Sequence, residues 1–316
     1  MSGVSGHLSA WFENNSWARR LTNLKQTYDE NRFPYLLVLP LFVFMAALVW
    51  AQFAYGLYMS FFQHGYTIET TKFIGLENYR FLLGWSVFHT AVVATMIYGV
   101  ATTVIHMVTA LLVALAVNQI RRANIFRSIA LLPYTMPPVA VGVLWYYLLD
   151  PNFGPVFSFL SKYGILNPIY WANDPTGAMA VITLVAGWTF WPFAFLIIDA
   201  SLTKIPAAQY ESARMYGANV LQRFRHVTFP HIKSALLVAG SIRVIWNLVK
   251  VGQPLALTEG GPGFATSILG ILLYNKTLSQ GRYGQAYAIG MFLLLLTVGF
   301  TYLLVREFYR EKAGGQ

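Results

Sequence analysis

The chain has no cysteine and little charge. The absence of Cys among its 316 residues excludes disulfides and thiolate metal sites. Charged residues make up only 11% of the chain, whereas an ordinary soluble domain carries about 25%. Hydrophobic residues make up 56%, and the mean hydropathy is positive. The composition therefore predicts a chain that is solvated mostly by lipid or by other apolar helices, with room for one membrane domain.

The sequence also lacks the features of an ATPase, an enzyme or a nucleic-acid-binding protein. It contains no G-x-x-x-x-G-K-[ST] phosphate loop and no Ser/His/Asp or carboxylate cluster where catalysis is plausible. The formal charge of +10 does not point to nucleic acid, because the basic residues flank apolar runs and so favour membrane topology. We predict that the chain binds no cofactor and hydrolyses nothing itself.

Six segments are apolar and long enough to cross a bilayer, which takes about 20 residues each. They are residues 35–61, 87–117, 125–149, 178–202, 234–257 and 286–305. Three prolines, Pro133, Pro137 and Pro138, interrupt the third segment and should kink or break it. The pattern predicts an all-α polytopic membrane protein with six transmembrane helices.

Most of the 22 Lys and Arg residues fall on one side of these six segments. The positive-inside rule makes that side cytoplasmic, so we expect a multi-pass protein of the cell membrane with both termini inside. We divide the chain into a cytoplasmic segment 1–33, a transmembrane domain 34–312 and a cytoplasmic tail 313–316. Residues 8–28 mix aromatics with charges and form either an interfacial helix or a partly disordered tail.

A polar, basic segment separates the fourth and fifth apolar runs. Pro206 and the small side chains that follow it predict a short helix from Ala207 to Tyr216, which Gly217 ends. Glu211 can pair with Arg214 at i,i+3 spacing or with a basic group on a partner. Pro230 should block helical continuation before the fifth span. The residues singled out in this segment are Glu211, Ser212, Ala213, Gly217 and Pro230. Taken without the rest of the sequence, the segment is better explained as an ordinary amphipathic interhelical loop with solvated charges.

The order of motifs along the chain resembles the permease subunits of binding-protein-dependent ABC importers. Glu211-Ser212-Ala213, Gly217 and the Val227-Thr228-Phe229-Pro230 run are similar to the "EAA" loop of that family. Further matches are residues 73–79 (F-x-G-L-x-N-Y), Leu132-Pro133, Pro137, Trp145, residues 152–154, residues 257–262 (L-T-x-G-G-P) and residues 283–286. Ser212, Val227 and Phe229 depart from the more usual Ala, Ile and Leu. The chain is identified as a MalF-like member of the carbohydrate-uptake family (maltose, trehalose or glycerol-phosphate type).

The resemblance implies a type I ABC importer transmembrane domain that supplies half of a translocation path for a sugar or oligosaccharide. The implied partners are a second homologous permease, an ATPase dimer that holds ATP and Mg, and an extracytoplasmic sugar-binding protein. No nucleic acid is expected. The helix at 207–217 would couple ATP-driven closure of the ATPase dimer to the transmembrane helices.

Polar and aromatic residues within the spans are candidates for the substrate path, because burying polar groups in lipid is costly. The candidates are Arg243, Asn247, Lys250, Trp188 and Trp246. The first three share one helix face. The alternatives are a structural Arg243 paired with Asp199, a Lys250 that snorkels outward, and tryptophans that fill the core. We expect His106 to be packed or hydrogen-bonded rather than a ligand. Basic groups leave a polyol phosphate or acidic sugar open as the substrate.

An ion-coupled secondary transporter is the main alternative function. That class should show internal repeats and carboxylates near the bilayer midplane, and Asp199 near one end of the fourth span is the one intramembrane acid in the six runs. An intramembrane enzyme is disfavoured by the absence of a paired nucleophile and base.

Overall fold

The computed structural model describes residues 33–34, 36–65, 71–120 and 123–314. The predicted segment 1–33, with its interfacial helix at 8–28, therefore lies outside the described residues except for its last position. The chain divides into two compact units, Met1–Tyr58 and Met59–Gln316, and each is described by itself.

The first unit contains an apolar helix. Within the stretch Leu36–Met59, a wide π-helical turn η1 (Ala46–Trp50) leads into α3 (Ala51–Met59). Acidic and basic residues are absent from both elements, and the stretch is long and apolar enough to cross a membrane. The structure therefore has a helix of spanning length where the first span, 35–61, was predicted.

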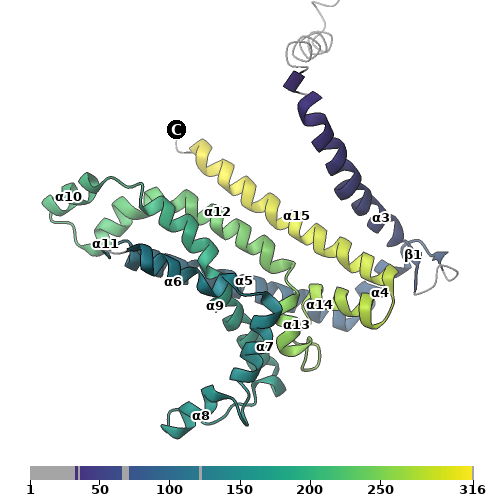
Figure 1. The fold of residues 1–316 in the computed structure, drawn as a ribbon. Coiled ribbons are helices and arrows are strands. Elements are labelled where there is room, and N and C mark those ends of the chain that lie inside the picture. The colour runs from purple at the N-terminus through teal and green to yellow at the C-terminus, as the bar shows by residue number, and fades with distance from the viewer. Residues whose placement is uncertain (1–32, 35, 66–70, 121–122, 315–316) are drawn as a thin grey trace, which may run out of the picture. The chain divides into compact units, whose positions relative to one another are not determined.

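The second unit is a helical bundle built on α5 (Ser86–Val117) and α9 (Pro175–Leu202). These two helices pack along each other, and α12 (Phe229–Leu248) packs against both (Figure 1). The last helix, α15 (Tyr283–Gly314), lies against α12, and α6 (Ala123–Thr135) lies against α9. Small side chains let the helices approach closely in lipid: α5 buries alanines and glycines such as Ala91, Gly99, Ala110 and Ala114.

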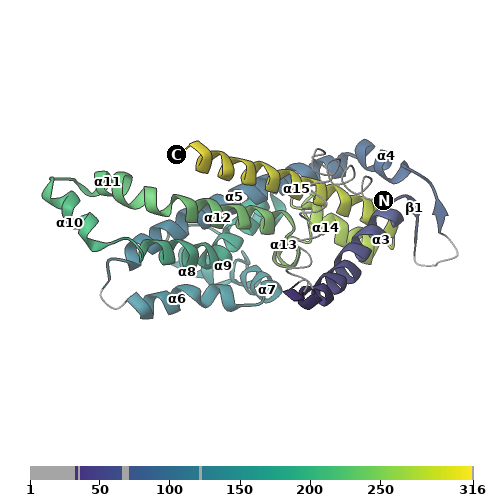
Figure 2. The ribbon, with the colours of Figure 1, turned by 90° about the horizontal axis from the view of Figure 1, so that it is seen from above.

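Short elements close the two ends of the bundle. One end carries α10 (Ala207–Met215) and α11 (Val220–Arg223), which continues into a π-helical turn η4 (Phe224–Thr228). The opposite end carries α4 (Glu77–Gly84) and α14 (Leu269–Tyr274) (Figure 2). The remaining elements are β1 (Phe62–Gln63), β2 (Lys72–Phe73), α7 (Pro138–Leu148), α8 (Pro155–Lys162), η3 (Trp171–Asn173), α13 (Gly252–Thr258) and η5 (Asn275–Ser279). The two strands pair antiparallel, Phe62 opposite Phe73.

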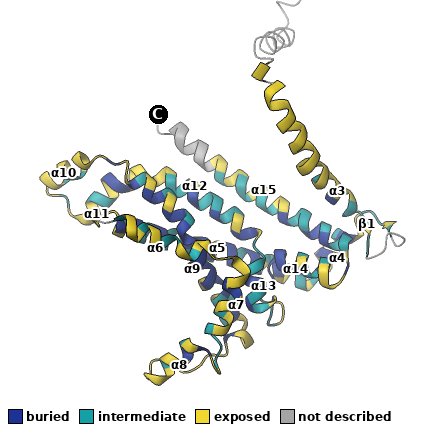
Figure 3. Cartoon of the chain, viewed as in Figure 1, coloured by how far each residue is buried: buried dark blue, intermediate teal, exposed yellow. Residues whose placement is uncertain are grey.

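The burial pattern suits a membrane environment. Buried residues line the contacts between α5, α9 and α12, while large apolar side chains stay exposed on the outward faces of the helices (Figure 3). Exposed apolar faces of this extent are stable where lipid rather than water surrounds them.

Four helices of the described chain are long and apolar enough to span a membrane. They are Leu36–Met59, Ser86–Val117, Pro175–Leu202 and Tyr283–Arg306. Two further apolar pairs are bent, by 90° between Ala123–Thr135 and Pro138–Leu148 and by 50° between Val220–Leu248 and Gly252–Thr258. The count reaches the predicted six if each bent pair crosses once. The expected proline break in the third segment is confirmed, since α7 begins at Pro138.

The fifth predicted span, 234–257, was wrong as one continuous helix. The helix starts earlier and stops at Leu248, and residues 249–251 leave helical geometry before α13 begins. Pro254 provides the physical reason, because it has no N–H to donate to the Lys250 carbonyl, and Gly252 is a poor helix former.

The expectation that Pro230 blocks helical continuation was also wrong. The backbone stays helical from Val220 to Leu248. The wide turn η4 ends at Thr228, two residues before Pro230, and the N–H of its C-cap Phe229 bonds to the Phe224 carbonyl. A π-bulge of this kind absorbs the hydrogen bond that proline cannot make.

Candidate functional site

A buried polar cluster lies where α5, α9 and α12 meet. Arg243 of α12 is fully buried. Its Nε donates to Nδ1 of His106 at 3.1 Å, and its Nη2 donates to Oδ1 of Asn247 at 3.2 Å. The amide of Asn247 in turn donates to Thr103 Oγ1 at 2.9 Å. The cluster therefore joins two helices through side chains that the membrane would otherwise leave unsatisfied.

His106 is held as a neutral hydrogen-bond relay. Its Nε2 lies 2.9 Å from the Ala186 carbonyl, which can only accept, so Nε2 carries the proton and Nδ1 accepts from Arg243. The expectation that His106 is packed or hydrogen-bonded rather than a metal ligand is confirmed. A neutral imidazole supplies no negative charge to Arg243.

Two cations share one aromatic ring in this region. The Lys250 Nζ lies 3.4 Å from the centroid of the Phe190 ring, and the Arg243 Cζ lies 5.5 Å from the same centroid. Cation–π contacts contribute about 2 kcal/mol when desolvated, whereas insertion scales put an unpaired cation at the helix centre at about 2.5–3.5 kcal/mol. The ring therefore offsets only part of the cost of holding these charges.

Neither cation of this cluster has a carboxylate partner within the described chain. The alternative in which Arg243 pairs with Asp199 was wrong, because Asp199 binds Arg127 of α6 instead. Nε and Nη2 of Arg127 donate to the two carboxylate oxygens at 2.8 and 3.2 Å. Because Arg127 binds both oxygens of Asp199, this carboxylate is not available to Arg243, and the Arg243 cluster stays positively charged.

The two path tryptophans are half-exposed on different helices. Trp188 of α9 and Trp246 of α12 are each 39% exposed. Trp188 packs edge-on against Trp145, and Trp246 lies 4.6 Å from Phe193 between ring centroids. Arg243 and Asn247 are buried within the chain, so of the predicted path residues it is Lys250 and the tryptophans that keep accessible surface.

The predicted short helix is present as α10. It begins after Pro206, which serves as its N-cap, and none of its residues is buried. A Schellman turn ends it: the Gly217 N–H bonds to the Arg214 carbonyl, the Ala218 N–H bonds to the Ala213 carbonyl, and Gly217 has a φ of +76°. The prediction that Gly217 stops this helix is confirmed.

Contacts on its inner side fix α10 to the bundle. Tyr210 Oη hydrogen-bonds Thr228 Oγ1 at 3.0 Å, and Ala213 packs against the core cluster that contains Ile205. A cleft of about 610 Å³ lies behind the helix and is lined by residues that include Glu211. Glu211 is exposed and forms no ion pair with Arg214 or with any other described residue, so its carboxylate is available to a partner.

The C-terminal end of α10 and the start of α11 expose apolar side chains. Met215 is 89% exposed and Tyr216 is 90% exposed, and Val220 and Leu221 of α11 are also largely exposed. Outside lipid, a cluster of exposed apolar side chains around a fixed helix is typical of a protein interface.

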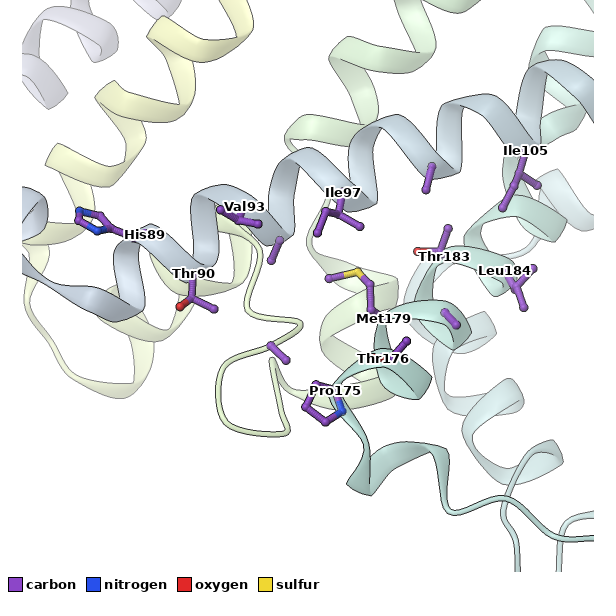
Figure 4. Close-up of a pocket in the computed structure, with 14 residues that line it drawn as sticks. His89, Thr90, Val93, Ile97, Ile105, Pro175, Thr176, Met179, Thr183 and Leu184 are labelled. Carbon is purple, nitrogen blue, oxygen red and sulfur yellow. The ribbon is translucent and has the colours of Figure 1, made fainter.

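One large hollow in the second unit is mostly apolar. It measures about 860 Å³ and runs between α5 and α9, with side chains such as Val93, Ile97 and Met179 along it and His89 at one end (Figure 4). Ligand sites need a few convergent polar groups to orient a solute. This hollow offers hydrocarbon contacts along most of its length.

A buried lysine lies at the opposite end of the bundle from α10. Lys276 in η5 is buried, with its Nζ 4.2 Å from the Trp85 ring centroid and 5.5 Å from that of Phe81. Burial, together with the nearby Arg282, lowers the pKa of Lys276 to about 8. The sequence gives no signal of this burial, because Lys276 lies between the fifth and sixth apolar runs.

Thr103 and Phe190 were also missed as members of the polar cluster. A sequence signal existed for the first, because Thr95, Gly99, Thr103 and His106 form a polar and small stripe along α5. No sequence pattern marks Phe190, whose role depends on the approach of α12.

These features define a polytopic α-helical permease with a fixed helix exposed at one end of its bundle. Residues 106–310 match the family model described as "Binding-protein-dependent transport system inner membrane component". The chain belongs to this family.

Individual relatives cover nearly the whole chain. The trehalose/maltose transport system permease protein MalF of Thermococcus litoralis is 29% identical over 91% of this chain and 98% of its own length. The sulfoquinovosyl glycerol transport system permease protein SmoG of Agrobacterium fabrum is 30% identical over 85% of this chain and 89% of its own length.

A solved structure confirms the predicted fold class. A chain from the crystal structure of a bacterial ABC transporter involved in the import of the acidic polysaccharide alginate superposes with a TM-score of 0.77. The two are 22% identical, and the match covers 91% of this chain and 99% of that one. The transmembrane fold of an ABC importer is therefore present here.

Proposed function

We propose that this chain is one permease subunit of an ATP-driven ABC importer for a sugar or sugar derivative. It would pair with a second homologous permease to form the translocation path. An ATPase dimer carrying ATP and Mg would supply the energy, and an extracytoplasmic binding protein would deliver the solute. The relatives reported above are permeases of transport systems for a neutral disaccharide and a sulfonated sugar glycerol, which supports this class of solute.

The observation that carries the proposal is the construction of α10. A short helix with no buried residue is fixed to the bundle through Tyr210, and its C-terminal end exposes an apolar tip. Glu211 lines the cleft beside the helix and keeps exposed surface. An ATPase that closes on such a helix would move the bundle with it. The proposed coupling residues are Glu211, Ser212, Ala213, Gly217 and Pro230.

The same assignment places the α10 end of the bundle in the cytoplasm of a cell whose plasma membrane the chain spans, with both termini inside. The excess of Lys and Arg near that end supports this orientation. Ion-coupled secondary transport gains no support from the relatives, which are permeases of binding-protein-dependent systems.

The test is uptake by the reconstituted transporter with Gly217→Pro and a matched control. Proline fixes φ near −65°, so it is incompatible with the +76° of Gly217 and should distort the turn after α10. Gly164 is the control, because it closes the same Schellman turn after α8 with a φ of +64° and also has open space around it.

We expect Gly217→Pro to reduce ATP-driven uptake at least about tenfold, with normal insertion, whereas Gly164→Pro should keep it. Glu211→Ala, which leaves the helix intact and removes only the carboxylate, should also lower uptake per ATP hydrolysed. Uptake at the unaltered level in the Gly217→Pro variant would refute α10 as the coupling helix.

A second test is purification in mild detergent, which should co-recover an ATPase and a second permease. A lone chain that transports solute under an ion gradient would contradict the importer.

A further inference from the structure

We propose that the helix break at residues 249–251 binds the anionic group of the transported solute, which is a sugar bearing a carboxylate, sulfonate or phosphate. This inference rests on the proposed import function and narrows its substrate class. Lys250 is the residue that contacts the anion.

The first argument is the backbone at the break. α12 ends at Leu248 and α13 begins at Gly252 with a bend of 50°. Non-helical backbone at membrane depth is tolerated where it is buried in protein or lines a water-filled cavity. Transporters place their solute sites at such interruptions of membrane helices. Lys250 stands within the break and keeps partial exposure.

The second argument is charge. The six candidate spans contain one acidic residue, Asp199, and Arg127 occupies both of its oxygens. Arg243 and Lys250 therefore stand as two cations with no acidic partner in the described part of the chain. A solute that brings its own negative charge would complete the cluster.

The third argument is that the two cations differ in burial and therefore in what they can contact. Arg243 is fully buried, and its contacts to His106 and Asn247 hold it in place behind the break. Its Nη1 is buried without a hydrogen-bond partner among the described residues. Lys250 projects over the Phe190 ring nearer the surface. Arg243 thus contributes positive potential, while the Lys250 ammonium is free to donate to an anion.

The surroundings suit a sugar attached to that anion. Trp246 lies one turn before Lys250 and keeps 39% of its surface exposed. Solute sites combine aromatic walls with a few placed polar groups. The Gln253 side chain, three residues after Lys250, is fully buried, and both of its amide atoms are unpartnered in the described chain.

The experiment uses the complete transporter, purified with its binding protein and reconstituted with ATP. Uptake is measured for three radiolabelled solute classes: a neutral disaccharide, a uronic-acid disaccharide and glycerol 3-phosphate. The variants are Lys250→Gln, Lys250→Arg and Lys276→Gln. Lys276 is the matched control, because it is also a lysine above an aromatic ring, at the α4 end of the bundle, and it is more deeply buried than Lys250.

We expect the transporter to take up an anionic solute. Lys250→Gln should lower that uptake about 10- to 100-fold, the effect of losing one charge-assisted hydrogen bond. Lys250→Arg should restore most of it, and Lys276→Gln should match the unaltered protein.

ATP-driven uptake confined to the neutral sugar would overturn the anion site and leave the import function intact. Equal uptake of the anion by Lys250→Gln and the unaltered protein would also overturn the anion site. A loss in Lys250→Gln that Lys250→Arg does not restore would show a structural role instead. Absence of ATP-dependent uptake of every solute would refute the proposed function, and the inference with it.

Discussion

The Arg127–Asp199 fork should be the strongest single polar contact between α6 and α9. Arg127→Met keeps the apolar stem of the side chain and removes the guanidinium, which leaves the Asp199 carboxylate with a side chain only 10% exposed. Removing one partner of a buried ion pair costs about 3–5 kcal/mol. The Arg127 side chain is 28% exposed, so water can reach the site after the change. We therefore expect a loss of about 1–3 kcal/mol.

The measurement is the thermal midpoint of the purified chain in detergent, which should fall by roughly 2–6 °C. Lys204→Met is the control, because Lys204 is exposed near the same end and forms no ion pair with a described residue.

A double-mutant cycle sharpens this test. Asp199→Leu alone should cost less than Arg127→Met, because the freed arginine can turn toward water whereas a freed carboxylate cannot. The double variant should be more stable than the sum of the two losses by about 1–2 kcal/mol. Additive losses, or an unchanged midpoint in Arg127→Met, would show that the fork does not hold α6 against α9.

Two further predictions concern the opposite end of the bundle. Gly270→Ala should lower the thermal midpoint by the equivalent of about 1–3 kcal/mol, because an added Cβ would lie 2.7 Å from the Lys250 carbonyl oxygen. Gly240→Ala is the control and should be neutral, because the atom nearest to its added Cβ is 3.9 Å away. Equal midpoints for the two variants would contradict the close contact at Gly270. Lys276 has a pKa near 8 when folded and about 10.4 when unfolded, so the unfolded chain binds more protons between these values and stability should rise as pH increases from 8 to 10. In a pH series of thermal midpoints, Lys276→Gln should abolish that rise in stability. A rise that persists in the variant would show that another group causes it.

Local signals in the sequence predicted the parts of the fold that local chemistry determines. Pro206 and Gly217 act on their own backbone, and the helix they bound was correctly placed. The proline break in the third span was foreseen for the same reason. Pro254 carried an equally local signal for the break after Leu248, but the apolar run around it was read as one continuous helix.

Contacts between distant residues could not be predicted in this way. Arg127 and Asp199 are 72 residues apart, and His106 and Arg243 are 137 apart. Their pairing depends on which helix faces meet, and charge alone left Asp199 equally available to Arg243. The π-bulge before Pro230 was missed because a proline is read as a stop unless the preceding turn can widen.

The contact between Gly270 and the Lys250 carbonyl limits how the broken helix can move. The absence of a side chain on Gly270 brings α14 directly against the break, and α14 in turn packs on α15 and α5. A swing of α13 about residues 249–251 would therefore push α14 and carry the start of the last helix with it. Motion at the bend is therefore coupled to motion of the final span through α14.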